Sequence, residues 1–312
     1  MSSLPRPERI FTHQSDLDGL VSGLLLKRLA DSEFGPGTRL ESHHYPSWKM
    51  RNLSERCAWA CDFSFEKRMD KPTWMIIDHH ATEVKAENCQ FIHDLNKSAS
   101  LLCYELCQDF GVQSEKLDRL VHLSNVADLY LENDPDFKLA VDYANLVKVY
   151  GFWNLHNLIN GNPERLLDHP LLEVMQTKRR IEDPMGLAWS RKRISKVTEE
   201  FGVVDTVVGD SNSIVHQLLE AGEGDYKVLA TMFQKSNRQV MVSFRSRNGE
   251  ALPIARQFQG GGHANACGAT LPHSVGSLKE AVIYMREILT PSASPGEGLS
   301  SLESAFAGLD LD

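Results

Sequence analysis

The segment from Trp74 to His80 constrains the fold of this chain more than any other. Its short apolar run, Trp-Met-Ile-Ile, ends abruptly in Asp78, His79 and His80. Such a run predicts a strand buried on both faces, as in the parallel sheets of α/β proteins. Open α/β sheets bind ligands at the carboxyl ends of their strands, so these polar residues are candidates for a functional site. A carboxylate and two imidazoles suit a divalent metal, although an ordinary polar turn after a strand would look the same.

A second group of candidate ligands follows an N-terminal strand predicted over residues 9–13. His13, Asp16 and Asp18 lie in the turn before a helix predicted over residues 19–29. A strand, a glycine-containing turn and a helix form the first unit of a doubly wound sheet. Capping this helix would need one carboxylate, whereas the turn supplies an imidazole and two carboxylates, which favours a metal site.

Two further carboxylates extend the pattern. Asp62 ends a strand predicted over residues 57–64, and Asp128 lies at the apolar end of a helix predicted over residues 114–131. Because the carboxyl ends of parallel strands share one edge of a sheet, we expect the polar groups that follow these strands to lie together. Asp128 needs a partner in an apolar setting, and the sequence leaves open whether this is a metal or a nearby Arg or Lys.

The bulk composition excludes several classes of protein. The chain has 312 residues, enough for two domains, with 42% hydrophobic and 24% charged residues, as in ordinary globular proteins. No apolar run approaches the roughly 18 residues that a membrane span needs. The net charge of −9 argues against binding long duplex nucleic acid but permits short phosphorylated ligands.

The N-terminal residues lack an apolar export signal and the cysteines form no C-x-x-C pair, so we expect a cytoplasmic location.

The second half of the chain has a different texture. A largely helical stretch over residues 164–201, interrupted at Pro184, precedes predicted strands at 203–210, 226–233 and 239–245 and predicted helices at 214–219, 252–258 and 277–289, whereas a helix predicted over residues 98–110 belongs to the first half. Arg245 ends the last of these strands, and three glycines, including Gly261 and Gly262, precede His263. Consecutive glycines let backbone N–H groups approach an anion, and a following helix N-terminus would add its dipole.

These features predict an α/β protein with two domains. We expect an N-terminal doubly wound parallel-sheet domain over residues 1–165 and a smaller C-terminal α/β domain over residues 203–290. A helical connector over residues 166–202 would join them, and residues 291–312 would form a flexible acidic tail.

The residues quoted above resemble the motifs of the DHH phosphoesterase superfamily. The stretch from His13 to Asp18 is similar to its first motif, Asp62 to its second, Asp78-His79-His80 to the motif that names it, and Asp128 to its fourth. The segment Gly260-Gly-Gly-His263-Ala-Asn-Ala-Cys-Gly268, with Ser243-Phe-Arg245-Ser upstream, resembles the signature of the DHH-associated C-terminal domain of nanoRNases, RecJ exonucleases and cyclic-dinucleotide phosphodiesterases. The resemblance spans roughly residues 9–290, and its first motif looks closest to NrnB-type oligoribonucleases.

The resemblance implies a two-metal phosphodiesterase with two Mn²⁺ ions per chain, or Mg²⁺ or Co²⁺ in their place. One ion would be held by His13, Asp16 and Asp62, and the second by Asp18, Asp62, His79 and Asp128. A hydroxide shared by the two ions would attack phosphorus. Asp78 would orient the imidazoles, and His80 would contact the phosphate and protonate the leaving oxygen. Arg245, Gly261, Gly262 and His263 would hold the substrate from the second domain, with the active site between the domains.

The implied activity is hydrolysis of short oligonucleotides. Cyclic or linear dinucleotides and 3′-phosphoadenosine 5′-phosphate are alternatives with the same chemistry, and polyphosphate is a weaker one. A nucleotide-binding regulator with a decayed site is an alternative of another class, because the spacing of His13 and Asp16 is unusual and the fourth motif is loose. A homodimer is compatible with the sequence, although no stretch predicts an interface.

Overall fold

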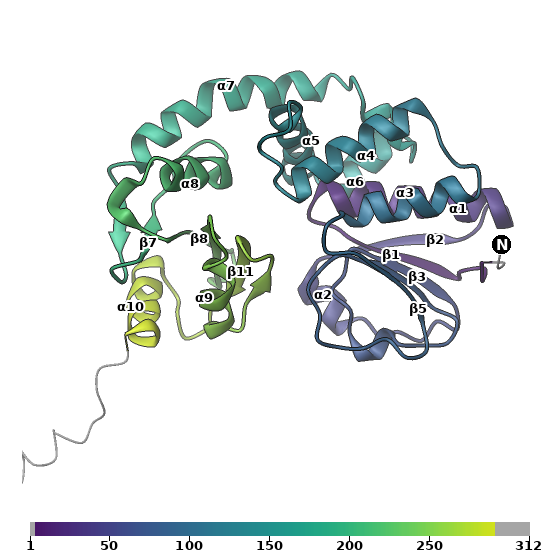
Figure 1. Ribbon diagram of the computed structural model, residues 1–312, viewed down its shortest axis with the longest axis horizontal. Helices are drawn as coiled ribbons and strands as arrows, with labels where there is room; N and C mark the ends of the chain where they lie inside the picture. The colour runs from purple at the N-terminus through teal and green to yellow at the C-terminus, as the bar shows by residue number, and fades with distance from the viewer. Residues whose placement is uncertain (1–3, 291–312) are drawn as a thin grey trace, which may run out of the picture. The chain divides into compact units, whose positions relative to one another are not determined.

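The computed structural model describes residues 4–290, and its chain divides into two compact units (Figure 1). The boundary falls between Arg180 and Ile181, inside the stretch predicted to connect two domains and within helix α7 (Leu171–Ser190). The tail predicted over residues 291–312 lies outside the described residues.

The first unit is built on a five-stranded sheet in which all neighbouring strands are parallel. The strand order is β2-β1-β3-β4-β5, with the bounds β1 (Arg9–His13), β2 (Arg39–His43), β3 (Ala58–Cys61), β4 (Met75–Asp78) and β5 (Gln90–His93). Strands β1, β3 and β4 confirm the sequence-based prediction, whereas β5 was not predicted. The chain winds outward from β1 in one direction to β2 and in the other to β3, so the topological switch point lies between β1 and β3.

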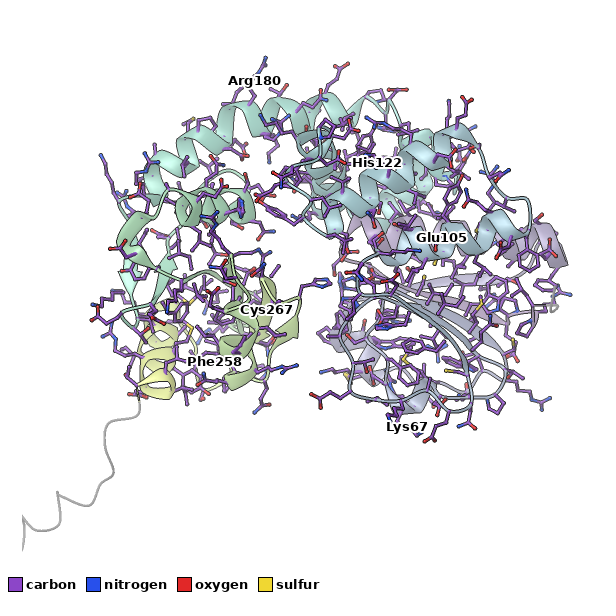
Figure 2. All side chains as sticks on the ribbon, viewed as in Figure 1. Lys67, Glu105, His122, Arg180, Phe258 and Cys267 are labelled. Atoms are coloured by element: carbon purple, nitrogen blue, oxygen red, sulfur yellow. The ribbon has the colours of Figure 1, made fainter. Side chains whose placement is uncertain are left out.

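Helices cover both faces of this sheet, and side chains fill the layers between them (Figures 1 and 2). Ile10 packs into the core beneath the long helices, while the next residue, Phe11, packs on the opposite face against Trp48. Strands buried on both faces explain the continuous apolar runs in the sequence. The helices of this unit are α1 (Leu17–Phe34), α2 (Tyr45–Met50), η1 (Lys67–Met69), α3 (Ala99–Asp109), α4 (Glu115–Asp128), α5 (Phe137–Tyr150), α6 (Phe152–Leu158) and η2 (Pro163–Leu166).

The second unit contains a six-stranded mixed sheet of order β10-β11-β9-β8-β7-β6. Only β7 and β8 pair in parallel; the other neighbours are antiparallel. The elements are β6 (Ile194–Lys196), β7 (Phe201–Val204), α8 (Ser211–Glu220), η3 (Glu223–Asp225), β8 (Val228–Gln234), β9 (Val240–Ser246), α9 (Ala251–Gln257), β10 (Gly261–Gly262), β11 (Ala266–Thr270) and α10 (Leu278–Leu289). Two apolar clusters of buried residues lie in this unit, one around Phe244 and the other around Leu218.

Three expectations about local structure were wrong. Helix α7 continues through Pro184, where an interruption was predicted; proline costs one backbone hydrogen bond but does not end this helix. Residues 194–196 form strand β6 inside the stretch predicted to be helical. The glycine segment leads into strand β11 rather than into a helix, so no helix dipole acts directly after it.

Among residues 4–290, no helix is both long enough and apolar enough to cross a lipid bilayer.

Candidate metal centre

The candidate ligands of the first unit gather at the carboxyl edge of the parallel sheet. His13 is the last residue of β1, Asp62 follows β3 directly, and Asp78 is the last residue of β4. His13 and Asp62 therefore flank the topological switch point, where open α/β sheets bind their ligands. The structure brings together the polar groups that the sequence places after three separate strands.

His13, Asp16 and Asp62 form the first ligand group. The Nδ1 atom of His13 lies 2.8 Å from Asp16 Oδ2 and 3.6 Å from Asp62 Oδ2. Asp16 also caps α1, because its Oδ1 accepts a hydrogen bond of 3.0 Å from the N–H of Gly19. The two interpretations of this turn, helix cap and ligand, therefore apply to different oxygens of one carboxylate. A Cβ at Gly19 would lie 2.2 Å from the carbonyl oxygen of His13, so the tight turn requires glycine.

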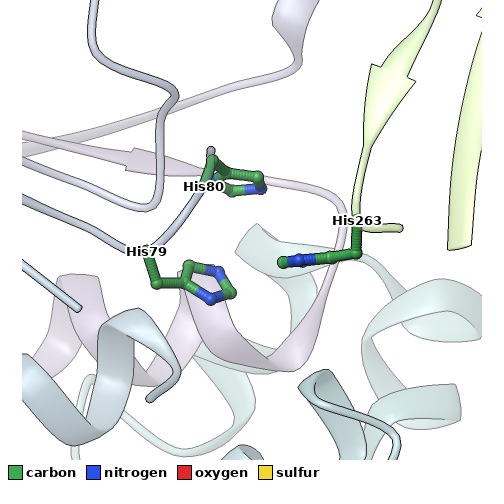
Figure 3. Close-up of side chains that lie close together, drawn as sticks. All are labelled: His79, His80 and His263. Carbon is green, nitrogen blue, oxygen red and sulfur yellow. The ribbon is translucent and has the colours of Figure 1, made fainter. Parts of the chain in front are cut away.

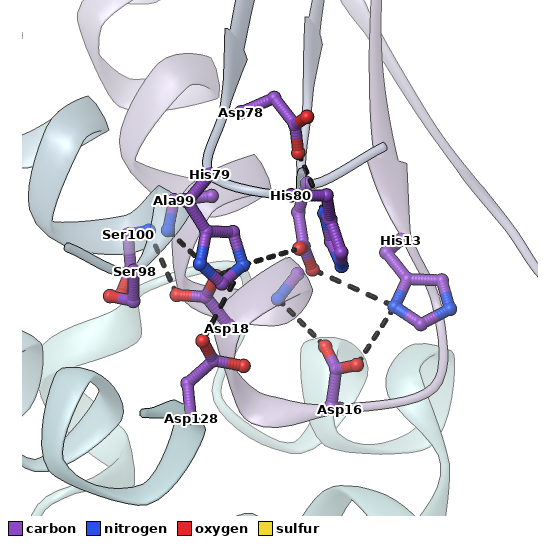
Figure 4. Close-up of polar contacts among 12 residues, drawn as sticks. His13, Asp16, Asp18, Asp78, His79, His80, Ser98, Ala99, Ser100 and Asp128 are labelled. Atoms are coloured by element: carbon purple, nitrogen blue, oxygen red, sulfur yellow. Dashed lines mark hydrogen bonds and ion pairs between the residues drawn. The ribbon is translucent and has the colours of Figure 1, made fainter. Parts of the chain in front are cut away.

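Asp18, His79 and Asp128 form the second ligand group (Figure 4). The Nε2 atom of His79 lies 3.8 Å from Asp18 Oδ2 and 3.4 Å from Asp128 Oδ2. The same nitrogen lies 3.6 Å from Asp62 Oδ1. The sequence left open a metal or a nearby Arg or Lys as the partner of Asp128; the structure instead places His79 beside it, and no Arg or Lys pairs with Asp128 among residues 4–290.

Asp62 joins the two groups through its two carboxylate oxygens. Its Oδ1 faces His79 and its Oδ2 faces His13, each at 3.6 Å. The backbone of Asp62 has a φ of 58°, a left-handed conformation that non-glycine residues adopt at some cost. That conformation turns the carboxylate between the two groups directly after β3 ends.

The N-terminus of helix α3 binds the carboxylate of Asp18, a contact that the sequence analysis did not predict. The N–H groups of Ala99 and Ser100 donate to Asp18 Oδ2 and Oδ1 at 2.9 and 2.8 Å (Figure 4). Free N–H groups and the helix dipole make a helix N-terminus a good partner for a carboxylate. The only available signal was the helix predicted over residues 98–110, whose first residue, Ser98, caps α3 by accepting from the N–H of Leu101.

Asp78 is fully buried and holds the ring of His80. The Nδ1 atom of His80 lies 2.7 Å from Asp78 Oδ1, and this contact orients the ring. The rings of His79 and His80 lie side by side, with centroids 4.6 Å apart (Figure 3). His93, another residue that was missed, places its Nε2 atom 2.8 Å from the carbonyl oxygen of His80 and so supports the backbone after β4.

The carboxylates of the second ligand group are buried and close together, and this shifts the pKa values of Asp18, Asp128 and His79. Burial and the neighbouring charge of Asp62 raise the pKa of Asp18 to about 6. Burial and the charge of Asp18 also raise the pKa of Asp128. Burial opposes the charged form of His79, but the carboxylates of Asp62, Asp128 and Asp18 outweigh it and raise the pKa of His79 to about 10. The site therefore favours positive charge at its centre.

The residues present fit divalent cations. Within each ligand group the donor atoms lie within 4.8 Å of one another. Ligands bound to one ion at about 2.1 Å are roughly 3.0–3.4 Å apart, close to the 3.4–3.8 Å around His79 Nε2. Within the described residues, Asp62 Oδ2 and Asp128 Oδ2 are buried oxygens without a hydrogen-bond donor. Mixed carboxylate and imidazole ligands suit Mn²⁺.

The substrate-binding residues predicted in the second unit lie on and beside its sheet. Arg245, on β9, donates from Nη1 to Ser243 Oγ at 3.0 Å and to the carbonyl oxygen of Phe244 at 2.8 Å. Gly261 and Gly262 form β10, the edge strand of the sheet, and a Cβ at Gly261 would meet no atom within 4 Å. His263 lies in the turn that follows, where its N–H donates to the carbonyl oxygen of Ala266.

Asn265 supports the neighbouring loop and was not predicted. Its Oδ1 accepts from the hydroxyl of Ser246 at 3.0 Å and from the N–H of Gly249 at 2.6 Å. This side chain ties the turn after β10 to the end of β9.

Comparison with known proteins agrees with this architecture. Residues 202–290 match the family model of the DHHA1 domain. The chain is also similar in structure to PggH, a pGpG-specific phosphodiesterase from Vibrio cholerae, with a TM-score of 0.53 and 14% identity over 90% of this chain and 98% of that one. The chain has the fold of the DHH phosphoesterase superfamily.

Two other solved structures with the DHH fold show comparable similarity. An exopolyphosphatase-related protein from Bacteroides fragilis has a TM-score of 0.52 at 16% identity, with 90% of each chain covered. An exonuclease RecJ bound to manganese has a TM-score of 0.51 at 14% identity, with 92% of this chain and 91% of that chain covered. By sequence alone, the chain matches no curated protein.

Proposed function

We propose that this protein is a metal-dependent phosphodiesterase that hydrolyses short oligonucleotides, with linear dinucleotides as the shortest substrates. The observation that carries the proposal is the pair of ligand groups joined by Asp62 at the switch point of the sheet. Two cations that share a carboxylate are the usual arrangement for in-line displacement at phosphorus.

His13, Asp16 and Asp62 would hold one Mn²⁺, and Asp18, Asp62, His79 and Asp128 would hold the other. When bound, the ions would supply Lewis acidity that lowers the pKa of water and offsets the charge on the phosphate. Mg²⁺ or Co²⁺ could replace Mn²⁺ at such ligands.

We assign phosphate binding and proton donation to His80. Asp78 fixes its Nδ1 atom, so the ring can present Nε2 to a substrate oxygen and donate a proton to the leaving group. The same contact fixes the ring's orientation, so that the proton is delivered in one direction.

We assign substrate binding to the second unit. The guanidinium group of Arg245 offers donors to a phosphate, and the edge at Gly261 and Gly262 lets a ligand approach the backbone closely. His263 would add a side-chain donor. The six free cysteines support a reducing compartment, so we place this activity in the cytoplasm.

The names of the similar structures support phosphate-ester chemistry on small substrates. One acts on pGpG, a linear dinucleotide, and another is an exonuclease bound to manganese. The net charge of −9 disfavours long nucleic acids. These points favour a substrate of a few nucleotides over long DNA.

The test is hydrolysis of an end-labelled trinucleotide and of pGpG in Mn²⁺, with an EDTA control. We expect metal-dependent release of mononucleotide. Release of inorganic phosphate from 3′-phosphoadenosine 5′-phosphate or polyphosphate, without cleavage of either oligonucleotide, would contradict the proposal. Binding of pGpG without turnover in saturating Mn²⁺ would instead support a regulator with a decayed site.

A further inference from the structure

Three buried serines form a continuous chain of hydroxyl groups behind the second ligand group. Ser98, Ser100 and Ser124 are fully buried. The Oγ atom of Ser100 lies 2.9 Å from that of Ser98 and 2.9 Å from that of Ser124. Ser124 Oγ in turn lies 3.4 Å from Asp18 Oδ1. Buried hydroxyls are costly unless they are hydrogen-bonded, and each of these hydroxyls has a partner in a series that leads to Asp18.

The hydrogen bonds of this chain run in one direction. Ser98 Oγ accepts from the N–H of Leu101, so its own proton is available to Ser100. Ser100 donates to Ser124, and an ionised Asp18 can only accept, so Ser124 donates to the carboxylate. Each bond polarises the next, and the chain thus stabilises negative charge on one defined oxygen of Asp18.

Ser124 also connects Asp18 to a ligand on another helix. Ser124 and Asp128 are four residues apart on α4 and therefore lie on the same helix face. The next residue, Asn125, accepts a 2.9 Å hydrogen bond from the N–H of Ser98. The Ser100–Ser124 and Ser98–Asn125 hydrogen bonds join α4 to the N-terminus of α3. The same N-terminus holds Asp18 through the N–H groups of Ala99 and Ser100. The position of Asp128 relative to Asp18 therefore depends on this junction.

We propose that Ser124 is a positioning residue that holds Asp18 and Asp128 in register for one divalent cation. The hydroxyl does not touch the ion; it orients Asp18 and fixes the helix that carries Asp128. This inference rests on the proposed function, since it assumes that the second ligand group binds metal.

The test is Mn²⁺ binding to the full chain, measured by equilibrium titration with detection of free Mn²⁺ by electron paramagnetic resonance. Ser124→Ala should weaken the binding of one Mn²⁺ by about 10- to 100-fold, the usual effect of losing a group that orients a metal ligand. Turnover of the labelled trinucleotide should then recover as Mn²⁺ is raised, which a purely structural defect would not produce. Ser22→Ala is the matched control, because Ser22 is a fully buried serine of the same unit whose hydroxyl has no hydrogen-bond partner among residues 4–290.

The outcomes separate the two claims. Wild-type protein that binds no Mn²⁺ would overturn the proposed function itself. Wild-type protein that binds Mn²⁺, together with Ser124→Ala protein of the same affinity, would overturn only the role of Ser124. If Ser124→Ala does not fold in EDTA, Ser100→Ala provides the test, because it removes the donor to Ser124 and should weaken the same Mn²⁺ by a smaller factor. Unchanged affinity in Ser100→Ala would then contradict the proposal.

Discussion

The two units of this chain use their sheets in different ways. In the first unit, the strand ends carry titratable side chains, and three carboxylates surround one nitrogen of His79. In the second unit, the edge strand is made of two glycines, and the nearby groups proposed to bind substrate are a guanidinium and an imidazole. The first arrangement suits cations and the second suits anions. The proposed metal centre and the proposed phosphate-binding surface thus differ in the groups they present: carboxylates and imidazoles at strand ends in the first unit, and glycine backbone beside a guanidinium and an imidazole in the second.

The largest expected effect comes from the residue that joins the two ligand groups. Asp62→Asn should lower kcat for the labelled trinucleotide by at least about 1,000-fold, because it removes charge from both groups. Asn adopts the left-handed conformation of Asp62 more readily than most residues, so the backbone should be preserved. The check is a steady-state assay at equal Mn²⁺, with the circular dichroism spectrum as the folding control.

A substitution at His80, in the same unit, should lower kcat by a smaller factor and should separate proton transfer from metal binding. His80→Gln should lower kcat by about 100-fold and leave Mn²⁺ affinity unchanged, because His80 acts on substrate in this account. His122→Gln, the same change at an exposed position on α4, should leave both quantities unchanged. Loss of Mn²⁺ affinity in His80→Gln would contradict the role assigned to His80 in substrate binding and would indicate that it is a metal ligand.

A substitution in the second unit should change KM, the parameter that reports substrate binding. His263→Ala should raise KM by about 10-fold and leave Mn²⁺ affinity unchanged, because one hydrogen bond to a charged ligand is lost. His273→Ala, at an exposed position of the same unit, is the control. An unchanged KM and kcat in His263→Ala would remove the glycine segment from the site.

The smallest effect tests the two glycines of β10 against each other. Gly262 has a φ of 132°, and a Cβ there would lie 2.7 Å from the carbonyl oxygen of Ala266. Gly262→Ala should therefore lower the free energy of unfolding by about 1–3 kcal/mol. Gly261→Ala should change it by less than about 0.5 kcal/mol but still raise KM if the edge contacts substrate. Urea denaturation compares the stability of the two variants, and steady-state kinetics give the KM of Gly261→Ala; an unchanged KM would show that this edge does not contact substrate.

The sequence predicted the parallel sheet and the gathering of polar groups because both depend on local patterns. Apolar runs mark β1, β3 and β4, and the candidate ligands directly follow these runs. The roles of His13, Asp62 and His79 as metal ligands stay predictions, although the structure gives them the required neighbours.

The elements and residues that were missed depend on contacts between distant parts of the chain. Strand β5 has only four residues, and it pairs at the sheet edge after polar flanks. Helix α7 tolerates Pro184, which a local pattern cannot foresee. Ser100, Ser124 and His93 act through partners between 13 and 106 residues away, so no local spacing reveals them.

The most direct test of the central claim is the stoichiometry of Mn²⁺ binding in wild-type protein and in Asp62→Asn. The account predicts two Mn²⁺ per wild-type chain and weakened binding of both in Asp62→Asn, because this carboxylate faces both ligand groups. One Mn²⁺ or none in the wild type, or two bound equally well without the Asp62 carboxylate, would contradict it.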